Sequence, residues 1–308
     1  MGKINKKRGM TMLTAEEKAK FIETLNGTSY VGEPVDNTFM FIKKQVEYLA
    51  PNLEGHKDCL VFAEDNITFS DDVIANNHVI FCEYPQYEYF LFAVDYRDVR
   101  APLPDFFEEE GYYITSDSTI GENCTIYPGC FIGPNVHIGD NALILPGAKI
   151  KHATIGDNFI CNENVVIGCN SFTKAKDPNG DLISMPSLGR VVIGNNVEIG
   201  ACDVIELATC GETVIGDNVK LDNLVSIGHE SILHKNVCMA AQATLAGFVE
   251  VGERTFIGVG ANVKNRITIG KDVTVGMGSV VGRAVKDGET VFGNLAKPIP
   301  ILKKTFQK

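Results

Sequence analysis

Apolar side chains recur along the second half of the chain with a period of six residues. From Ile215 to Val281 every sixth residue is aliphatic, a series of twelve positions without interruption. The same period runs, in shorter groups, through residues 114–150, 155–167 and 193–205. An α-helix repeats every ~3.6 residues and a β-strand every two, so neither produces this pattern. A period of six, with glycine often following the aliphatic residue, is typical of hexapeptide repeats.

The repeat predicts a mainly β fold, a left-handed parallel β-helix with a triangular cross-section. Each hexapeptide forms one short strand and one corner, so three of them close a coil of 18 residues. The aliphatic residue points inward, and the small residue four positions later fills the remaining space, as at Val219, Val237, Ala243 and Thr255. Glycine serves corners where a side chain would collide or where φ is positive. Families with this repeat wind left-handed, an exception to the usual right-handed crossover.

Two interruptions of the period predict segments that leave the regular coil. Residues 170–190 are polar and contain proline and glycine, so we expect an external loop there. Residues 206–214 form a shorter break and predict a bulged corner. Loops on a rigid scaffold are where binding residues concentrate, which makes both breaks candidates for a functional role.

The first 104 residues carry no repeat and predict a small α/β domain. An amphipathic helix is expected at residues 14–25, where Thr14 and Glu17 have the spacing of a capping box. Buried strands are expected at residues 59–62 and 78–82, and a helix at 85–94. The predicted organisation is an α/β domain at 1–104, a β-helix at 105–292 and a tail at 293–308.

Composition excludes several classes of protein. The chain has 28 basic and 39 acidic residues, a net charge of −11, and no long basic stripe, which argues against nucleic-acid binding. It contains no apolar run of the roughly 18 residues that a membrane span needs. The basic start is not followed by an apolar segment, so we expect a cytoplasmic protein without a secretory signal. The nine cysteines form no CxxC pair and are expected to be reduced, mostly structural thiols.

Among the six histidines, His229 has the most informative position. It is the third residue of its hexapeptide, so its side chain should point outward at an edge of the prism. Adding 18 residues repeatedly gives Gly247, Asn265 and Arg283 along the same edge. This edge would form a groove with a base, a residue without a side chain, an amide and a cation.

A metal site is the alternative interpretation of the histidines. The spacing of His229 and His234 resembles the paired histidines of γ-class carbonic anhydrases. Those enzymes need a third histidine about two coils upstream, and the residues around Ile193 provide none. We therefore predict no metal site, and expect His234 to face solvent or an interface.

Longer motifs resemble a known family. Residues 189–202 and 213–229 look like UDP-3-O-acylglucosamine N-acyltransferases of lipid A synthesis, and residues 164–172 resemble that family's substrate loop. Residues 37–41 and 83–87 are weakly similar to its uridine-binding domain. The resemblance covers most of the chain and is most specific between residues 189 and 229.

This resemblance implies acyl transfer from a thioester to the amine of a nucleotide-linked sugar. His229 matches the family's general base, and the backbone N–H of Gly247 matches its oxyanion donor. Glu230, or another carboxylate such as Asp222, is expected to orient the imidazole. Candidate substrate contacts are Asn170, Phe172, Asp222, Asn223, Glu230 and, if they stack on a base rather than fill the core, Phe39 and Phe41.

The C-terminal region departs from the lipid A enzyme. It has no room for that family's C-terminal helices, which help to dock acyl carrier protein, and residues 293–298 instead resemble the ending of CoA-dependent sugar acetyltransferases. Residues 264–308 contain nine basic and three acidic side chains. Phosphates of a CoA donor would be bound by a set of polar and basic residues, Asn265, Arg283, Lys286 and Lys297, although a solvated basic tail explains the charge equally simply.

The sequence therefore predicts an N-acyltransferase of surface polysaccharide (O-antigen or capsule) synthesis. It would use acyl-CoA, with a short acyl group such as acetyl, as a co-substrate and hold no permanent cofactor. The family resemblance also implies a homotrimer with sites between subunits. The alternatives are the acyl-carrier-protein-dependent lipid A enzyme and a non-enzymatic β-helix scaffold. UDP and dTDP sugars, and amine and hydroxyl acceptors, are not distinguished at this point.

Overall fold

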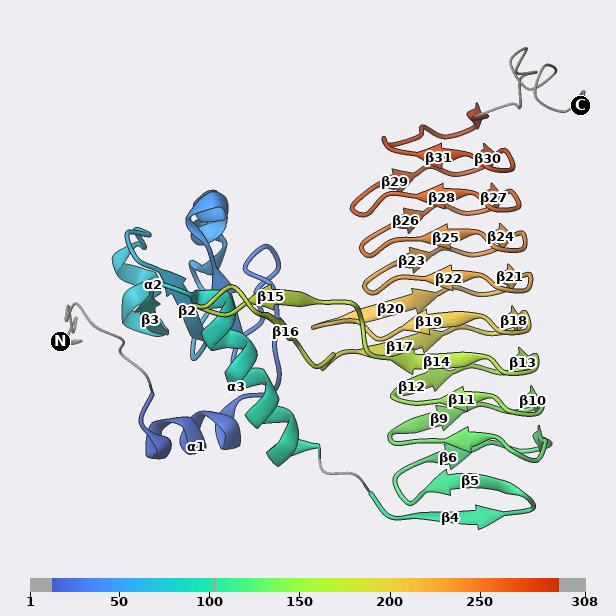
Figure 1. Ribbon diagram of the computed structural model, residues 1–308, viewed down its shortest axis with the longest axis horizontal. Helices are drawn as coiled ribbons and strands as arrows, with labels where there is room; N and C mark the ends of the chain where they lie inside the picture. Colours follow the sequence, from blue (N-terminus) through green and yellow to red (C-terminus); the bar gives the residue numbers. More distant parts are fainter. Residues whose placement is uncertain (1–12, 102–103, 294–308) are drawn as a thin grey trace, which may run out of the picture.

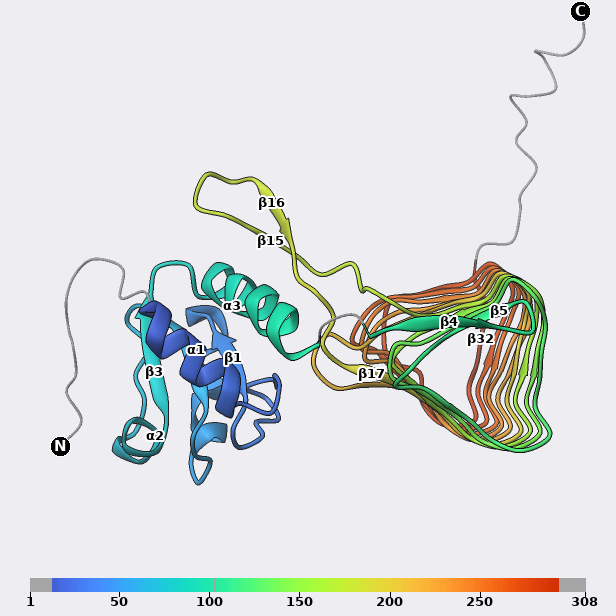
Figure 2. The same cartoon turned by 90° about the horizontal axis from the view of Figure 1, so that it is seen from below.

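The computed structural model describes residues 13–101 and 104–293 and shows two parts (Figure 1). An α/β region stands beside a tall stack of coils. Seen from below, the stack has a triangular outline with three flat faces (Figure 2). The coils wind left-handed as the chain climbs from β5 to β31. The predicted fold class, a left-handed parallel β-helix preceded by a small α/β region, is confirmed.

The α/β region is a parallel sheet covered by helices. Its strands lie in the order β1 (Phe39–Ile42), β2 (Leu60–Glu64) and β3 (His78–Cys82). The helical elements are α1 (Ala15–Thr24), η1 (Lys44–Leu53), α2 (Asp71–Asn76) and α3 (Pro85–Arg100). The predicted capping box is present, because Thr14 Oγ1 accepts the Glu17 N–H while the Glu17 carboxylate accepts the Thr14 N–H. The predicted helices and strands are confirmed, although α3 extends to Arg100 rather than residue 94, and β1, η1 and α2 are additions to them.

Three sheets form the faces of the β-helix. Face 1 contains β6 (Thr119–Ile120), β9 (Val136–Ile138), β12 (Ala153–Ile155), β17 (Arg190–Ile193), β20 (Glu212–Ile215), β23 (Ile232–Leu233), β26 (Glu250–Val251) and β29 (Thr268–Ile269). Face 2 contains β7 (Thr125–Ile126), β10 (Leu143–Ile144), β13 (Ile160–Cys161), β18 (Glu198–Ile199), β21 (Lys220–Leu221), β24 (Cys238–Met239), β27 (Phe256–Ile257), β30 (Thr274–Val275) and β32 (Thr290–Val291). Face 3 contains β4 (Phe106–Glu109), β5 (Tyr112–Thr115), β8 (Phe131–Ile132), β11 (Lys149–Ile150), β14 (Val166–Cys169), β19 (Val204–Glu206), β22 (Ser226–Ile227), β25 (Thr244–Leu245), β28 (Asn262–Val263) and β31 (Val280–Val281).

In-register stacking fills the interior of the prism with aliphatic side chains. Ile215 pairs with Leu233 one coil later, and Leu233 pairs in turn with Val251. The whole predicted series from Ile215 to Val281 is buried, as are the small inner residues that the repeat predicted. Burial of one such aliphatic side chain contributes roughly 1.5–3 kcal/mol, so the stacked columns are the main source of stability. Among the described residues, no helix has the length and apolar character required to cross a bilayer.

Glycine serves the corners in two ways, and asparagine shares one of them. A Cβ on Gly139 would lie 2.4 Å from Oδ1 of Asp157 in the next coil, so this glycine permits a close approach between coils. The left-handed conformation occurs at glycines such as Gly147 (φ 80°) and also at asparagines such as Asn141 (φ 60°) and Asn158 (φ 58°). Asparagine tolerates this conformation better than most residues because its short side chain bonds locally. Both expectations for glycine, that it avoids collisions and that it adopts positive φ, are confirmed, and asparagine shares the second role.

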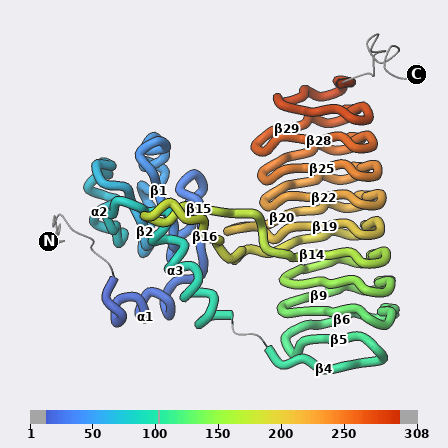
Figure 3. Tube along the Cα trace, in the orientation of Figure 1, coloured from blue at the N-terminus to red at the C-terminus, as the bar shows by residue number. Residues whose placement is uncertain are grey.

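Both predicted breaks leave the regular coil and extend toward the α/β region (Figure 3). The first forms an antiparallel hairpin of β15 (Lys174–Lys176) and β16 (Leu182–Ser184). Its residues Ala175 and Met185 are buried in the core of the α/β region together with Phe39 and Tyr89. The second lies between β19 and β20 and adds four residues to its coil, since Ile193 pairs with Ile215, 22 positions later, rather than 18.

Asp203 is a carboxylate inside the prism, at an inner position that the two neighbouring coils fill with Val165 and Val225. It is fully buried, and its two oxygens accept the backbone N–H groups of Val225 (2.7 Å) and Gly200 (3.1 Å). Burial raises the pKa of Asp203 to about 7, and the nearby charge of Asp222 adds to the increase. Desolvation therefore outweighs the two hydrogen bonds, which by themselves would favour the charged form.

We expect Asp203 to make the free energy of unfolding depend on pH. A carboxyl group with a raised pKa binds its proton more tightly in the folded state, so its contribution is complete below pH ~4 and is lost as the pH rises through ~7. The total loss is roughly 4 kcal/mol. In Asp203→Asn, urea denaturation between pH 4 and 8 should show a flatter dependence than in the wild type. Parallel curves for the two proteins would contradict this assignment.

Candidate active site

His229 lies at the edge where face 3 meets face 1. It follows β22, and its side chain is 21% exposed, so a ligand can reach the ring. Nδ1 hydrogen-bonds Oε2 of Glu230. Because an ionised carboxylate can only accept, the ring hydrogen of neutral His229 lies on Nδ1 and Nε2 keeps its lone pair. The residue predicted as the base is thus held in the tautomer that can take up a proton at Nε2.

Glu230 is the carboxylate that fixes this imidazole. Its side chain is only 7% exposed, yet both oxygens have partners. Oε2 bonds His229, while Oε1 accepts the O–H of Tyr30 (2.7 Å) and the backbone N–H groups of Thr209 and Cys210. Donors on both oxygens of this buried carboxylate hold its orientation. Of the two carboxylates predicted to orient the imidazole, the structure brings Glu230 to that place.

The backbone at Glu230 adopts the left-handed conformation, with φ of 54°. Corners at another edge have asparagine at such positions, for example Asn218 (φ 56°) and Asn236 (φ 61°), whereas the equivalent residue one coil later is Phe248 (φ 61°). Glutamate has no local advantage in this conformation, so the fold holds it there against its preference. A glutamate at a corner, directly after a histidine, is a sequence signal for this site.

Gly247 lies directly beside the imidazole, one coil after His229. A Cβ on Gly247 would lie 2.6 Å from Nε2 and 2.7 Å from Cε1 of His229, so only glycine fits the present position of the ring. Its backbone N–H donates none of the hydrogen bonds found between the described residues. A backbone donor that is available beside the base is what the predicted oxyanion role of Gly247 requires. That role stays a prediction.

Two side chains that the sequence analysis did not select complete the surroundings of His229. The ring of Phe248 packs edge-to-face on His229 (5.3 Å between centroids) and on Tyr30 (5.4 Å). The guanidinium of Arg266, in the next coil, lies 4.0 Å from the centroid of the Phe248 ring. This cation–π contact places a positive charge close to the base.

Two of the predicted donor-binding residues, Asn265 and Arg283, continue the same edge. Lys286 instead follows Val285, which pairs with Ile269 of face 1, and so lies at the edge where face 1 meets face 2. Asn265 lies one coil beyond Gly247, as the hydrogen bond from the neighbouring Arg266 N–H to the Gly247 carbonyl shows. Asn265, Arg283 and Lys286 are exposed. Lys297 and nearly all of the predicted tail lie outside the described residues. Their roles toward a donor stay predictions.

The predicted residues of the substrate loop lie at the root of the hairpin. Phe172 is 80% exposed, and Lys174 Nζ lies 4.9 Å from its ring centroid. Asn170 is exposed, and its Oδ1 accepts the Ser187 N–H (3.3 Å). The hydroxyl of Thr209 bonds those of Ser171 and Thr173, so the hairpin root adjoins the segment that donates to Glu230.

Asp222 and Asn223 lie at a different edge from His229, where face 2 meets face 3. Asp222 accepts the N–H groups of Asn223 and Ala241, and Asn223 Oδ1 accepts the Ala201 N–H. Both side chains are exposed and also stabilise their corner. Within one chain the structure therefore does not bring these two predicted sugar contacts to the base.

The two phenylalanines proposed for base stacking belong to the core of the α/β region. Phe39 is fully buried and packs on Tyr89, Phe92 and Tyr96. Phe41 is half-buried against Tyr89, with 5.0 Å between ring centroids. The sequence analysis left open a role in the hydrophobic core for both residues. Phe39 has that role, and Phe41 packs against the same core.

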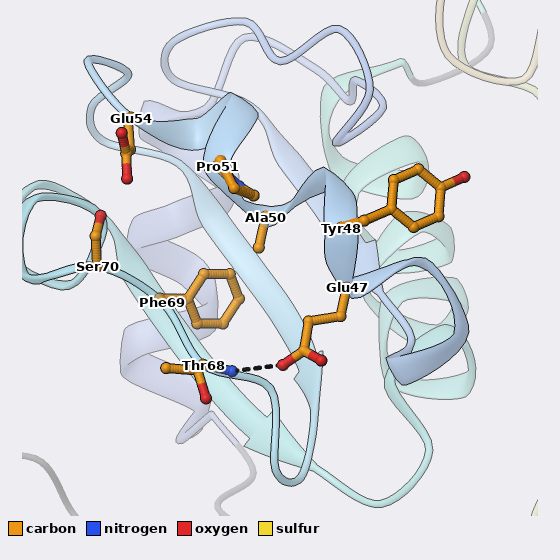
Figure 4. A pocket seen from close by; sticks show the side chains of 8 residues that line it. All are labelled: Glu47, Tyr48, Ala50, Pro51, Glu54, Thr68, Phe69 and Ser70. Atoms are coloured by element: carbon orange, nitrogen blue, oxygen red, sulfur yellow. Dashed lines mark hydrogen bonds between the residues drawn. The ribbon is translucent and has the colours of Figure 1, made fainter.

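A separate pocket of about 420 Å³ opens in the α/β region (Figure 4). It lies between η1 and the segment before α2, and Glu47 bridges its two sides by accepting the Thr68 N–H (3.0 Å). The complete lining is Glu47, Tyr48, Ala50, Pro51, Glu54, Thr68, Phe69 and Ser70. With two carboxylates and no basic side chain in its lining, the pocket is poorly suited to the phosphates of a nucleotide.

Comparison with known proteins agrees with the repeat. Residues 117–152 match the model of the bacterial transferase hexapeptide (six repeats). The UDP-3-O-acylglucosamine N-acyltransferase of Caulobacter sp. strain K31 is 35% identical over 152 residues, 49% of this chain and 44% of that protein. The probable UDP-3-O-acylglucosamine N-acyltransferase 2, mitochondrial, of Arabidopsis thaliana is 34% identical over 151 residues, 49% of this chain and 50% of that protein.

Solved structures share the fold. The UDP-N-acetylglucosamine acyltransferase from Campylobacter jejuni superposes with a TM-score of 0.53 and 27% identity, over 57% of this chain and 68% of that chain. The UDP-N-acetylglucosamine O-acyltransferase from Moraxella catarrhalis, at 20% identity over 60% of this chain and 70% of that chain, also gives 0.53 and supports the fold alone. The chain resembles the hexapeptide-repeat acyltransferases. It spans about half the length of the curated relatives that it matches.

Proposed function

We propose that this protein is an acyltransferase that moves an acyl group from a thioester to the amino group of a nucleotide-linked sugar. The observation that carries the proposal is the imidazole of His229, fixed by Glu230 with Nε2 beside the N–H of Gly247, two groups that have no hydrogen-bond partner among the described residues. The names of the curated relatives support N-acyl transfer to a UDP-linked sugar.

Each chemical step has a group in this arrangement. Nε2 of His229 accepts a proton as the acceptor's amine attacks the thioester carbonyl carbon and the N–C bond forms. The negative charge on the carbonyl oxygen is stabilised by the Gly247 N–H. When the tetrahedral intermediate collapses, the C–S bond breaks and the imidazolium returns its proton to the leaving thiolate. Glu230 stays ionised throughout and stabilises the imidazolium.

The acceptor is best represented by a UDP-linked 3-O-acylated glucosamine. The relatives are named for this substrate, which supports the alternative of a lipid A enzyme better than the predicted O-antigen or capsule role. Simpler UDP- and dTDP-linked amino sugars are the next acceptors to test. The α/β region is a nucleotide-binding candidate by its weak sequence similarity alone.

The donor would lie along the edge that continues above Gly247. Exposed Asn265 and Arg283 provide an amide and a cation there, and exposed Lys286 adds a cation at the next edge, across face 1, which supports a donor with phosphate groups. Acyl-CoA and acyl carrier protein both present their thioester on a phosphopantetheine arm, so this edge suits either. The proposed co-substrate remains a short acyl-CoA, and the assay must include the carrier protein.

We also propose that the active form is a trimer. Asp222 and Asn223 lie at another edge from His229, next to exposed apolar residues such as Leu224 (53%), Val259 (47%) and Met277 (64%). Such side chains along one edge of a prism favour contact with an identical neighbour. Cyclic association would bring this edge of one chain toward the His229 edge of the next.

The proposal is tested by following release of free thiol from the donor. We expect release from acetyl-CoA or from a longer acyl-carrier-protein thioester to require one of the nucleotide-linked amino sugars, and mass spectrometry to find an amide product. Replacement of the acceptor amine by a hydroxyl separates N- from O-acyl transfer. Absence of acceptor-dependent release with every donor, from protein shown to be folded, would refute the proposed function.

A further inference from the structure

The α/β region contributes a side chain to the network that holds His229. Tyr30 lies between α1 and β1, 200 positions before Glu230 in the chain, and its O–H donates to Glu230 Oε1 at 2.7 Å. Among the described residues it is the side chain that shares this carboxylate with His229. We propose that Tyr30 is a positioning residue, which sets the orientation of the imidazole through Glu230. This inference rests on the proposed function of His229 as the base.

Chemistry at Tyr30 favours a permanent donor. Burial raises its pKa far above the usual range, and the neighbouring Cys210 and Glu230 act in the same direction. The phenol therefore stays protonated at any pH at which the protein works and always donates to Glu230. Its bond leaves Oε2 of the carboxylate for His229, so the two oxygens have separate partners.

The ring of Tyr30 is held in place by the β-helix itself. Phe248 packs edge-to-face on Tyr30 and on His229, so the two residues share one aromatic neighbour. Two residues before Tyr30, Thr28 Oγ1 bonds both Tyr89 (2.6 Å) and Cys210 (3.7 Å). This second contact lies on the same bulged corner, whose N–H groups donate to Glu230.

The hairpin of β15 and β16 adds a third attachment between the two parts of the protein. Its Ala175 and Met185 are buried among side chains of the α/β region, as described above. The α/β region is therefore attached at the hairpin, at Cys210 and at Glu230. A displacement of this region would remove the Tyr30 hydrogen bond and free Glu230 to rotate. The geometry of the base thus depends on the docking of the α/β region.

Tyr30→Phe tests this inference, because it removes the donor and keeps the ring. We expect kcat to fall about 10-fold, the loss typical of one hydrogen bond to a charged group, with KM for the donor within twofold. The matched control is Tyr96→Phe, which removes a buried hydroxyl of the same region that donates to the Leu25 carbonyl rather than to Glu230. It should keep kcat within twofold. Equal losses in the two variants would overturn the proposal.

A spectroscopic readout separates this proposal from the proposed function. The Nδ1 proton of His229, in its bond to Glu230, should give a strongly downfield NMR signal that shifts in Tyr30→Phe and not in Tyr96→Phe. This measurement needs no substrate, so it applies even if no acceptor is found. In a Glu230→Gln background, Tyr30→Phe should change kcat by less than twofold. An unchanged signal in folded Tyr30→Phe, or full additivity with Glu230→Gln, would overturn the role of Tyr30.

Discussion

Replacing His229 by alanine should lower kcat/KM for acyl transfer by about 10²–10⁴-fold, the usual contribution of a general base. The variant loses the group whose Nε2 would accept the proton of the attacking amine. Glu230 keeps its bonds from Tyr30, Thr209 and Cys210, so the corner should stay folded. Release of free thiol in the presence of acceptor measures the effect, and thermal unfolding checks that the variant is native.

His234 provides the matched control for this prediction. It lies five positions after His229, and its Nε2 bonds the exposed Glu250 at 2.8 Å, away from the proposed base. His234→Ala should retain kcat/KM within twofold of the wild type. If His229→Ala kept a third or more of the activity, or if both variants lost it equally, His229 would not be the base.

Gly247→Ala should be the next most damaging change, with a loss of about 100-fold in kcat. The added Cβ would lie 2.6 Å from His229 Nε2, closer than real side chains approach, so the imidazole or the corner must move. A displacement of about 1 Å at a reacting group is enough for a loss of this size. Movement of the Gly247 N–H would also weaken the proposed oxyanion site.

Crowding of a corner can also lower stability, and Gly252→Ala isolates that effect. Its Cβ would meet the backbone of Gly270 at 2.6 Å, at an edge that does not contain His229. We expect similar decreases in Tm for Gly247→Ala and Gly252→Ala, measured by thermal unfolding. A large loss of kcat should appear in Gly247→Ala alone. Normal kcat in folded Gly247→Ala would remove this residue from the site.

The comparisons shift the interpretation of the substrate and leave that of the chemistry unchanged. Motifs around residues 189–229 pointed to N-acyl transfer, and the names of the curated relatives support it. The C-terminal similarity to CoA-dependent acetyltransferases favours surface polysaccharides, whereas those relatives are named for UDP-3-O-acylglucosamine. That similarity lies almost wholly outside the described residues, so the donor has to be decided by the assay.

The hexapeptide period determined the β-helix by itself because its information is local and repeated. Every sixth side chain must be apolar for the coils to stack, as in the column of Ile215, Leu233 and Val251. Neither an α-helix nor a simple β-strand requires this spacing. The same arithmetic placed Gly247 beside His229, since residues 18 positions apart occupy equivalent corners of successive coils. Regular geometry made these neighbours predictable.

Only the tertiary structure decided how the α/β region meets this edge. The bond from Tyr30 to Glu230 joins residues 200 positions apart, and no periodicity relates them. The break after Glu206 was visible in the sequence, but its role was not. The N–H groups of Thr209 and Cys210 bind Glu230 only because the fold brings that carboxylate against them. Phe39 likewise became a core residue through packing on helix α3. Repeats specify contacts between equivalent positions, whereas contacts between unlike parts depend on the shapes and polar groups that folding brings together.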